Sequence, residues 1–286
     1  MSLPEALTTG ERRTRAPFGR RLARVGGGED HGAYRLLWAT DPGGPSDPCP
    51  GQFYMLAAAS GWGGAEDGRP YLPRAFSHAR VRRDPDGAHR LGFLLEAIGP
   101  GTERLAALES GDDLWLAGPF GTGFRPPAPA SDAGRAVLVG GGIGSAPILA
   151  LADEHGQDAT VLLGYRSARH FAAASLFAGE PRVATDDGSV GRHARVTDLL
   201  REELDRDARA TVFACGPPPM LEAVRALCAA RGVEAQLALE SGMACGDGAC
   251  FGCVVPTRDG FVRLCLDGPV LDAARLETAL FEGAVQ

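Results

Sequence analysis

The chain has 286 residues, of which 44% are hydrophobic, and its formal net charge is −7. A chain of this length can bury a sizeable core and should divide into two or more domains. The acidic balance gives no support for a nucleic-acid partner. No apolar run reaches the length of about 18 residues that spans a bilayer. The charged start of the chain is unlike a secretory signal, so we expect a cytoplasmic protein without membrane insertion.

The N-terminal part is expected to be a flexible extension over 1–20, followed by an all-β region over 21–127. In this region short apolar runs alternate with turn clusters, which predicts a small barrel or sandwich. One helix is expected at Thr102–Leu108, with Thr102 as its N-cap. The expected strands are Tyr34–Trp38, Gln52–Leu56, Arg74–Val81, Arg90–Glu96 and Asp113–Ala117.

A proline-rich stretch, Arg125–Pro129, is typical of a stiff linker between domains. After it strands and helices alternate, which predicts a parallel α/β domain over 134–240. The expected strands are Ala136–Val139, Thr160–Leu163 and Thr211–Ala214, and the expected helices are Ala146–Asp153, Thr197–Leu204 and Pro219–Ala230. The remainder, 241–286, is rich in Gly and Cys and is expected to form a small third unit.

Four of the seven cysteines follow the spacing C-x4-C-x2-C-x11-C. They are Cys245, Cys250, Cys253 and Cys265. Crowded cysteines in a chain without an export signal indicate metal binding rather than disulfides. This spacing is that of a plant-type 2Fe–2S site, in which glycines let the loop wrap closely around the sulfurs. A tetrahedral zinc site is the alternative, and the first gap of four residues favours iron–sulfur.

The other cysteines give weaker signals. Cys49 lies far from the cluster in sequence and is expected to be a spectator. Cys228 falls on the apolar face of an expected helix and is most simply a core residue.

The segment Arg74-Ala75-Phe76-Ser77 opens an expected strand. An arginine fork can hold a pyrophosphate through two hydrogen bonds, and a small hydroxyl three residues later can meet the polar edge of a flavin ring. The pattern R-x-x-S by itself usually reflects only a solvent-exposed arginine on a strand. Gly101 and Thr102 then open a helix whose free N–H groups suit a second phosphate contact, which strengthens the flavin interpretation.

A glycine turn, Gly140–Gly144, connects an expected strand to a helix, as in a phosphate cradle. It departs from the strict dinucleotide fingerprint, because Ser145 takes the sixth position and the second strand ends at 165–167 without an acid for the ribose. A second signal follows a later strand at 214–220, where ligands bind in open α/β sheets. The candidate contacts are Gly141, Gly142, Ile143, Gly144, Cys215, Gly216 and Pro217. These residues do not distinguish NAD from NADP as the nucleotide that binds.

These motifs, with Pro50–Phe53 and Gly118–Gly121, resemble the ferredoxin-NADP reductase family. The resemblance implies a six-stranded antiparallel FAD-binding barrel, with Arg74 on the FAD pyrophosphate and Ser77 near the flavin ring. It also implies FAD contacts along Leu94, Leu95 and Glu96, although relatives often carry Tyr-Arg where this strand ends, so Glu96 departs from the pattern. For 134–240 it implies an NAD(P)-binding domain in which Cys215 borders the nicotinamide.

Within this superfamily, Glu240–Cys253 and 265–270 resemble the electron-transfer subunits of NAD-dependent dihydroorotate dehydrogenase. The resemblance implies an FMN-containing catalytic partner subunit, from which electrons pass through the 2Fe–2S cluster and FAD to NAD⁺ in pyrimidine biosynthesis. No catalytic residue is expected, because the cofactors carry the chemistry. Two alternatives stay open: a related subunit serving a hydrogenase, a sulfide dehydrogenase or a ferredoxin:NADP system, and a non-catalytic zinc-binding module.

Overall fold

The structure is a computed structural model that describes residues 14–15, 17, 19–64, 68–84, 88–125 and 135–281. Most of the expected extension over 1–20 lies outside these residues, as does the proline-rich stretch after Arg125. Among the described residues, no helix is both long and apolar enough to cross a membrane.

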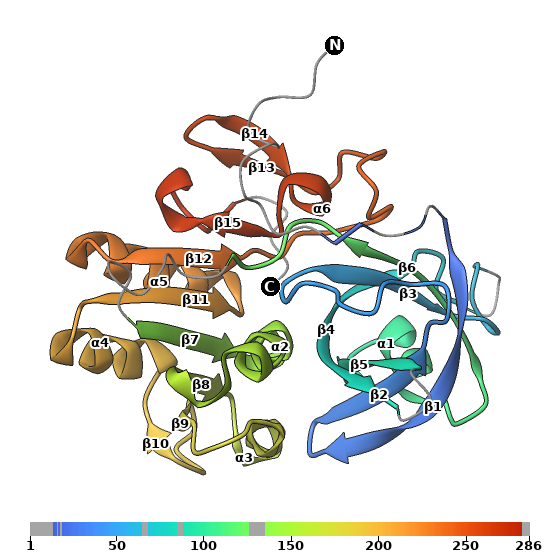
Figure 1. The fold of residues 1–286 in the computed structure, drawn as a ribbon, viewed down its shortest axis with the longest axis horizontal. Helices are drawn as coiled ribbons and strands as arrows, with labels where there is room; N and C mark the ends of the chain where they lie inside the picture. The colour runs from blue at the N-terminus through green and yellow to red at the C-terminus, as the bar shows by residue number, and fades with distance from the viewer. Residues whose placement is uncertain are drawn as a thin grey trace.

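The first half of the chain is a closed barrel of six antiparallel strands in the order β1-β2-β5-β4-β3-β6 (Figure 1). Its strands are β1 (Arg21–His31), β2 (Tyr34–Thr40), β3 (Phe53–Ala58), β4 (Arg74–Arg83), β5 (His89–Glu96) and β6 (Asp113–Phe120). The predicted barrel is therefore confirmed. Strand β1 has few apolar residues and three consecutive glycines, so apolar runs did not reveal it, yet its pairing with β2 and β6 closes the barrel.

Helix α1 spans Pro100–Ala106, which corrects the expected range Thr102–Leu108. Gly99 is the N-cap, and Thr102 lies in the first turn instead. The Thr102 hydroxyl accepts hydrogen bonds from the backbone N–H groups of Ile98 and Gly99 at 3.0 and 3.1 Å. Thr102 thus reaches back to stabilise the start of the helix, which explains why it resembled a cap in the sequence.

The second half is built on a seven-stranded sheet in the order β10-β9-β8-β7-β11-β12-β15. All neighbouring pairs are parallel except β12 and β15. The strands are β7 (Arg135–Gly141), β8 (Ala159–Tyr165), β9 (Arg182–Thr185), β10 (Arg192–His193), β11 (Ala210–Cys215), β12 (Glu234–Ala238) and β15 (Val270–Asp272). The predicted parallel α/β architecture is confirmed, with one antiparallel strand at its edge.

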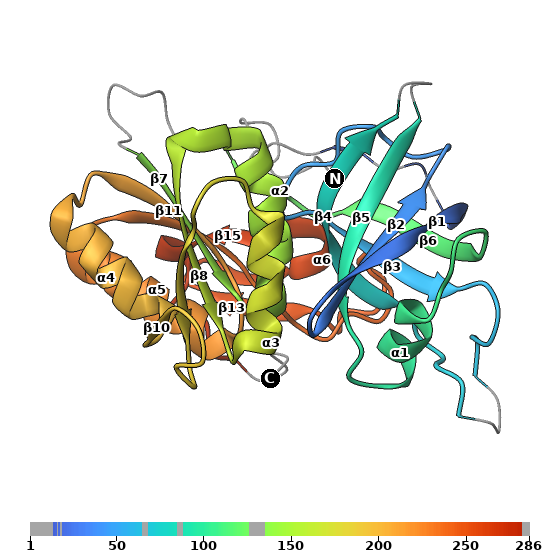
Figure 2. The same cartoon turned by 90° about the horizontal axis from the view of Figure 1, so that it is seen from below.

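Helices cover both faces of this sheet. They are α2 (Ser145–His155), α3 (Ala168–Phe171), α4 (Val196–Arg206) and α5 (Pro218–Arg231). Helix α2 lies between the sheet and the barrel and contacts β4 as well as β7, whereas α4 and α5 cover the opposite face (Figure 2). The barrel and the α/β domain therefore pack closely through α2.

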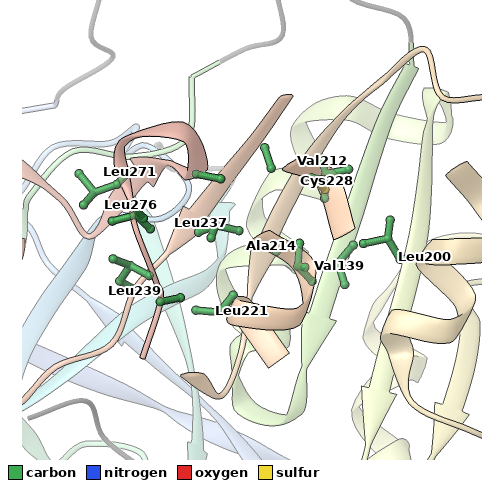
Figure 3. Close-up of a cluster of buried hydrophobic side chains, with 14 of the residues drawn as sticks. Val139, Leu200, Val212, Ala214, Leu221, Cys228, Leu237, Leu239, Leu271 and Leu276 are labelled. Carbon is green, nitrogen blue, oxygen red and sulfur yellow. The ribbon is translucent and has the colours of Figure 1, made fainter. Parts of the chain in front are cut away.

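The C-terminal unit contains the hairpin β13 (Val254–Thr257) and β14 (Gly260–Arg263), the short helix α6 (Leu264–Asp267) and β15. It lies across both larger domains (Figure 1). One buried cluster joins it to the α/β domain, with Leu271 and Leu276 beside Leu237 and Leu221 (Figure 3). The same cluster includes Phe53 and Met55 of the barrel, as well as Cys253 and Cys265 of the C-terminal unit. The three predicted units thus share a continuous apolar core.

Candidate functional site

A cavity of about 410 Å³ lies where the barrel, the α/β domain and the start of the C-terminal unit meet. Many residues that the sequence singled out from distant segments line it together: Arg74, Ala75, Phe76, Ser77, Leu94, Glu96, Thr102, Ile143, Gly144 and Cys215. Its wall is mostly apolar with a few polar groups, which is the usual composition of a cofactor site. The tertiary structure therefore places residues predicted to contact the flavin and residues predicted to contact the pyridine nucleotide around one cavity.

The guanidinium of Arg74 is held in place by three neighbours. Its Nη1 donates a hydrogen bond to the Leu72 carbonyl oxygen at 2.6 Å. Its Cζ lies 5.8 Å from the centre of the Trp62 ring, in a cation–π contact. A Cβ on Gly101 would lie 2.7 Å from its Nε, so the guanidinium lies directly against the start of α1. Arg74 and the start of α1 thus converge, as a phosphate site requires. No sequence pattern pointed to Trp62.

Not every candidate residue reaches the cavity. Leu95 is 1% exposed and belongs to the buried cluster inside the barrel, because alternate residues of β5 face opposite sides. Gly101 lies behind Arg74 rather than on the cavity wall. Four candidates of the pyridine-nucleotide half are also absent from the wall: Gly141, Gly142, Gly216 and Pro217.

The glycine turn at 140–144 and the segment at 214–220 nevertheless lie against each other. A Cβ on Gly144 would lie 2.5 Å from the carbonyl carbon of Cys215. A Cβ on Gly141 would lie 3.2 Å from Cδ of Pro217. Strands β7 and β11 are direct neighbours, with Gly140 opposite Cys215, so the two strand ends meet. The glycines therefore serve close packing between the two strand ends, whether or not a ligand is bound.

Buried titratable groups line or adjoin the cavity. Burial raises the pKa of Glu240 to about 7, and burial also raises the pKa of Cys215 well above its usual range. His78, next to Ser77, is fully enclosed, and burial lowers its pKa to about 4. At neutral pH the Cys215 and His78 side chains are therefore uncharged. The sequence did not identify Glu240 as a site residue, because a single acid after a strand gives no periodic signal.

The four predicted cluster cysteines lie together in the C-terminal unit as two pairs. The sulfur atoms of Cys253 and Cys265 are 3.2 Å apart, and the backbone nitrogen of Cys250 lies 3.4 Å from the Cys245 sulfur. In the described part of the chain, no three His, Cys, Asp or Glu side chains are close enough to share one metal ion. A 2Fe–2S cluster takes two protein ligands on each iron, so paired thiols fit it better than they fit a single tetrahedral zinc.

The backbone of the cysteine loop has the conformation that a wrapped cluster needs. Gly246, Gly248 and Phe251 have positive φ angles of 78°, 89° and 59°. The Gly252 N–H points at the Cys250 sulfur at 3.4 Å. This N–H, together with Cys245, lowers the pKa of Cys250 to about 7 and favours the thiolate that binds metal. Donor set and loop together therefore fit an iron–sulfur cluster.

The remaining cysteines lie elsewhere. Cys49 is buried in the barrel region, with its sulfur 3.2 Å from the Thr14 hydroxyl. Cys228 is 1% exposed within the core cluster of Figure 3. Neither is part of the cysteine loop.

The cysteine loop adjoins the cavity. The segment Leu239–Met243 lines the cavity and leads directly into Cys245. A Cβ on Gly246 would lie 2.5 Å from Cγ of Met55, so the loop rests on strand β3. Met55 is in turn paired with Ala75 of the cavity wall. The cysteine loop and the cavity wall are thus connected both through the paired strands β3 and β4 and through the segment Leu239–Met243.

Known proteins are similar to this chain in sequence and in fold. Residues 240–277 match the family model described as the iron–sulfur cluster binding domain of dihydroorotate dehydrogenase B. A solved NADH-dependent reduced ferredoxin-NADP oxidoreductase is similar in fold, with a TM-score of 0.72, 23% identity and 92% coverage of each chain. A ferredoxin reductase of carbazole 1,9a-dioxygenase has a TM-score of 0.58 at 21% identity, covering 75% of this chain and 66% of that one.

Two curated relatives carry the name dihydroorotate dehydrogenase B (NAD(+)), electron transfer subunit. The protein of Bacillus caldolyticus is 38% identical over 79% of this chain and 86% of its own length. The protein of Caldanaerobacter subterraneus subsp. tengcongensis is 34% identical over 78% of this chain and 85% of its own. This similarity extends well beyond the cysteine segment. The chain belongs to the family of electron transfer subunits of dihydroorotate dehydrogenase B (NAD(+)).

Proposed function

We propose that this chain transfers electrons from an FMN-containing dihydroorotate dehydrogenase catalytic subunit to NAD⁺, in the cytoplasmic biosynthesis of pyrimidines. The observation that carries the proposal is the continuity of Leu239–Met243, which lines the interdomain cavity and then enters the cysteine loop. When bound, an iron–sulfur cluster carries single electrons, and a flavin can exchange them for a hydride with NAD⁺. Family membership supports the identity of the partner.

Within this proposal each domain has a role. The barrel over 21–127 holds FAD, the domain over 134–240 binds NAD⁺, and the unit over 241–286 holds the 2Fe–2S cluster. The proposed cluster ligands are Cys245, Cys250, Cys253 and Cys265, and the reduced thiols suit the cytoplasm. Arg74, whose guanidinium approaches the start of α1, is proposed to hold the FAD pyrophosphate together with Thr102, and both line the cavity. Residues 75–77 and Leu94 form the wall along the flavin.

The remaining residues shape the cavity. Ile143 and Gly144 line the same cavity as Ser77, and Cys215 joins them on its wall as an uncharged thiol. Their apolar surface excludes water from the space where a nicotinamide would meet the flavin, which protects a hydride in transfer. No residue is assigned as a catalytic acid or base.

The test uses anaerobically purified chain, alone and with the catalytic subunit encoded by the same genome. We expect iron, sulfide and FAD in the chain alone, and NADH-dependent reduction of an artificial acceptor. Dihydroorotate-dependent reduction of NAD⁺ should appear only when both subunits are present. Zinc without iron or flavin would contradict the cofactor assignment. Bound cofactors with no dihydroorotate activity in the assembled pair would instead favour a related reductase with another partner.

A further inference from the structure

The pyridine-nucleotide half lacks an acidic residue at a position where dinucleotide-binding folds use one. In such folds an Asp or Glu near the end of the second strand accepts a hydrogen bond from a ribose hydroxyl. Here the second strand, β8, ends at Tyr165, and the turn after it is Arg166-Ser167-Ala168. The turn itself therefore offers no carboxylate to a ribose.

The structure brings a carboxylate to this turn from the barrel. Glu96, the last residue of β5, has its Oε1 3.3 Å from Nε2 of His170 in α3. The other ring nitrogen of His170 lies 2.9 Å from the Ser167 hydroxyl. Glu96 also lines the interdomain cavity, and its side chain is 24% exposed, so one of its sides remains open to a ligand. The chain Glu96–His170–Ser167 thus crosses the domain boundary at the end of β8.

Neighbouring contacts fix this arrangement. Tyr34 lies opposite Glu96 in the pairing of β2 with β5, and its ring packs edge-on against His170 at 5.7 Å. The Tyr34 hydroxyl is 3.8 Å from the place of a Cβ on Gly142, so the group adjoins the glycine turn. The backbone N–H of Ala33 donates to the Arg169 carbonyl oxygen at 3.0 Å. The barrel is therefore attached to the turn that should meet the nucleotide.

We propose that Glu96 accepts the hydrogen bond of the adenosine ribose 2′-hydroxyl and that His170 positions its carboxylate. The inference rests on the proposed function, in which this domain binds a pyridine nucleotide. A carboxylate at this place repels a 2′-phosphate, so Glu96 selects NAD(H) over NADP(H). The barrel thereby supplies a carboxylate that the turn after β8 lacks.

Asp186 and Asp187, in the turn after β9, are the competing carboxylates, and neither lies on the cavity wall. Asp187 provides a matched control. Its Oδ1 accepts hydrogen bonds from the backbone and the hydroxyl of Ser189, at 2.9 and 2.6 Å. The Ser189 hydroxyl in turn accepts from the Ala168 N–H at 2.7 Å. Asp187 is therefore engaged within its own turn, and it is not on the cavity wall. Arg166 and Arg169 are exposed beside the turn, so the experiment must also offer a 2′-phosphate.

The experiment measures binding of ADP-ribose and 2′-phospho-ADP-ribose to the FAD-loaded chain by titration calorimetry. The wild-type chain should bind ADP-ribose more tightly than its 2′-phosphate. Glu96→Gln should weaken ADP-ribose binding by roughly 10-fold or more, as expected for one charged hydrogen bond, and should reduce the discrimination. Asp187→Asn should stay within about 2-fold of wild type, in line with an uninvolved surface group. His170→Gln should give a smaller loss than Glu96→Gln.

Three results would overturn the inference. Glu96→Gln could retain both the affinity and the discrimination, or Asp187→Asn could reproduce the expected loss. Glu96→Gln could also lose FAD while the flavin-loaded fraction binds ADP-ribose as wild type does, which would make Glu96 a flavin contact. If the wild-type chain binds neither probe, the proposed pyridine-nucleotide function fails together with the inference. FAD content, measured by absorbance on each sample, separates these cases.

Discussion

Arg80 of barrel strand β4 and Asp153 of helix α2 form a two-pronged ion pair between the barrel and the α/β domain. Nε and Nη2 of Arg80 donate to the two carboxylate oxygens at 2.5 and 2.8 Å, and Nη2 also donates to the Leu176 carbonyl oxygen at 2.8 Å. The side chains are 19% and 35% exposed. A planar guanidinium matched to a carboxylate fixes orientation as well as distance, so this pair helps to fix how α2 packs against β4.

Asp153→Asn should weaken this junction. We expect the free energy of unfolding to fall by about 1 kcal/mol, the scale of a well-formed but partly exposed ion pair. Urea unfolding, followed by both tryptophan fluorescence and circular dichroism, would measure it. Asp205→Asn is the control, because Asp205 pairs with Arg231 within one domain and is 57% exposed. If both variants lost the same free energy of unfolding, the ion pair between the domains would contribute no more than an ordinary surface pair.

Cys250→Ser should abolish the iron–sulfur cluster. Cys250 is an exposed member of the loop, and serine cannot supply the thiolate that its lowered pKa favours. We expect iron and sulfide to be lost, while FAD and the NADH-dependent reduction of an artificial acceptor stay largely intact. Metal analysis and visible absorbance of anaerobic samples would measure this.

Cys228→Ser is the matched control for the loop cysteine, since Cys228 is buried in the α/β core and should leave the iron content unchanged. If NADH no longer reduced the FAD in Cys250→Ser, the proposed order of electron carriers would be wrong.

Arg74→Lys should weaken FAD binding. Lysine keeps the charge but loses the planar fork, so it cannot offer paired donors to a pyrophosphate while it also contacts Leu72 and Trp62. We expect the dissociation constant of FAD to rise roughly 10- to 100-fold, which corresponds to a charged hydrogen bond. Flavin fluorescence during titration of the apoprotein would report it. Arg83→Lys, at the exposed far end of the same strand, should change little, and a similar effect there would point to general loss of the barrel.

Glu240→Gln should alter how stability depends on pH. Burial raises the folded-state pKa of Glu240 to about 7, above the ordinary value of 4.5. Between these values the folded state binds more protons than the unfolded state, so its contribution to stability declines as pH rises through this window. The total is at most about 3.5 kcal/mol at about 1.4 kcal/mol per pKa unit, and less because Glu240 is partly exposed.

The difference in the free energy of unfolding between the variant and wild type should therefore favour the variant more at pH 8 than at pH 5. Denaturant unfolding at both pH values would measure it. Glu234→Gln, at an exposed strand start, is the control and should show no such gain. A difference between variant and wild type that does not change with pH would contradict the assigned ionisation.

Local chemistry was readable from the sequence. The cysteine spacing, the R-x-x-S segment and the glycine turn depend on residues close together in the chain, and alternating apolar patterns gave the barrel strands and the α/β order. Strand β1 was not predicted, because its pairing with neighbouring strands, rather than its own apolar residues, makes it a strand. Thr102 was misplaced as a cap because a first-turn hydroxyl and a cap hydroxyl look alike in sequence.

Relationships between distant segments were decided by the tertiary structure alone. The sequence could not place Glu96 beside His170, because that contact depends on how two domains pack. It could not place Trp62 beside Arg74, because that contact depends on how the loop after β3 folds back against β4. Leu95 was expected at the site but does not reach it. The pleat of β5 points its side chain toward the barrel core, whereas Leu94 and Glu96 line the cavity. The sequence by itself thus determined which chemical groups are present and in what local order. Only packing through α2 and the C-terminal unit decided which of them face the same cavity, since burial of apolar surface acts between segments of any separation.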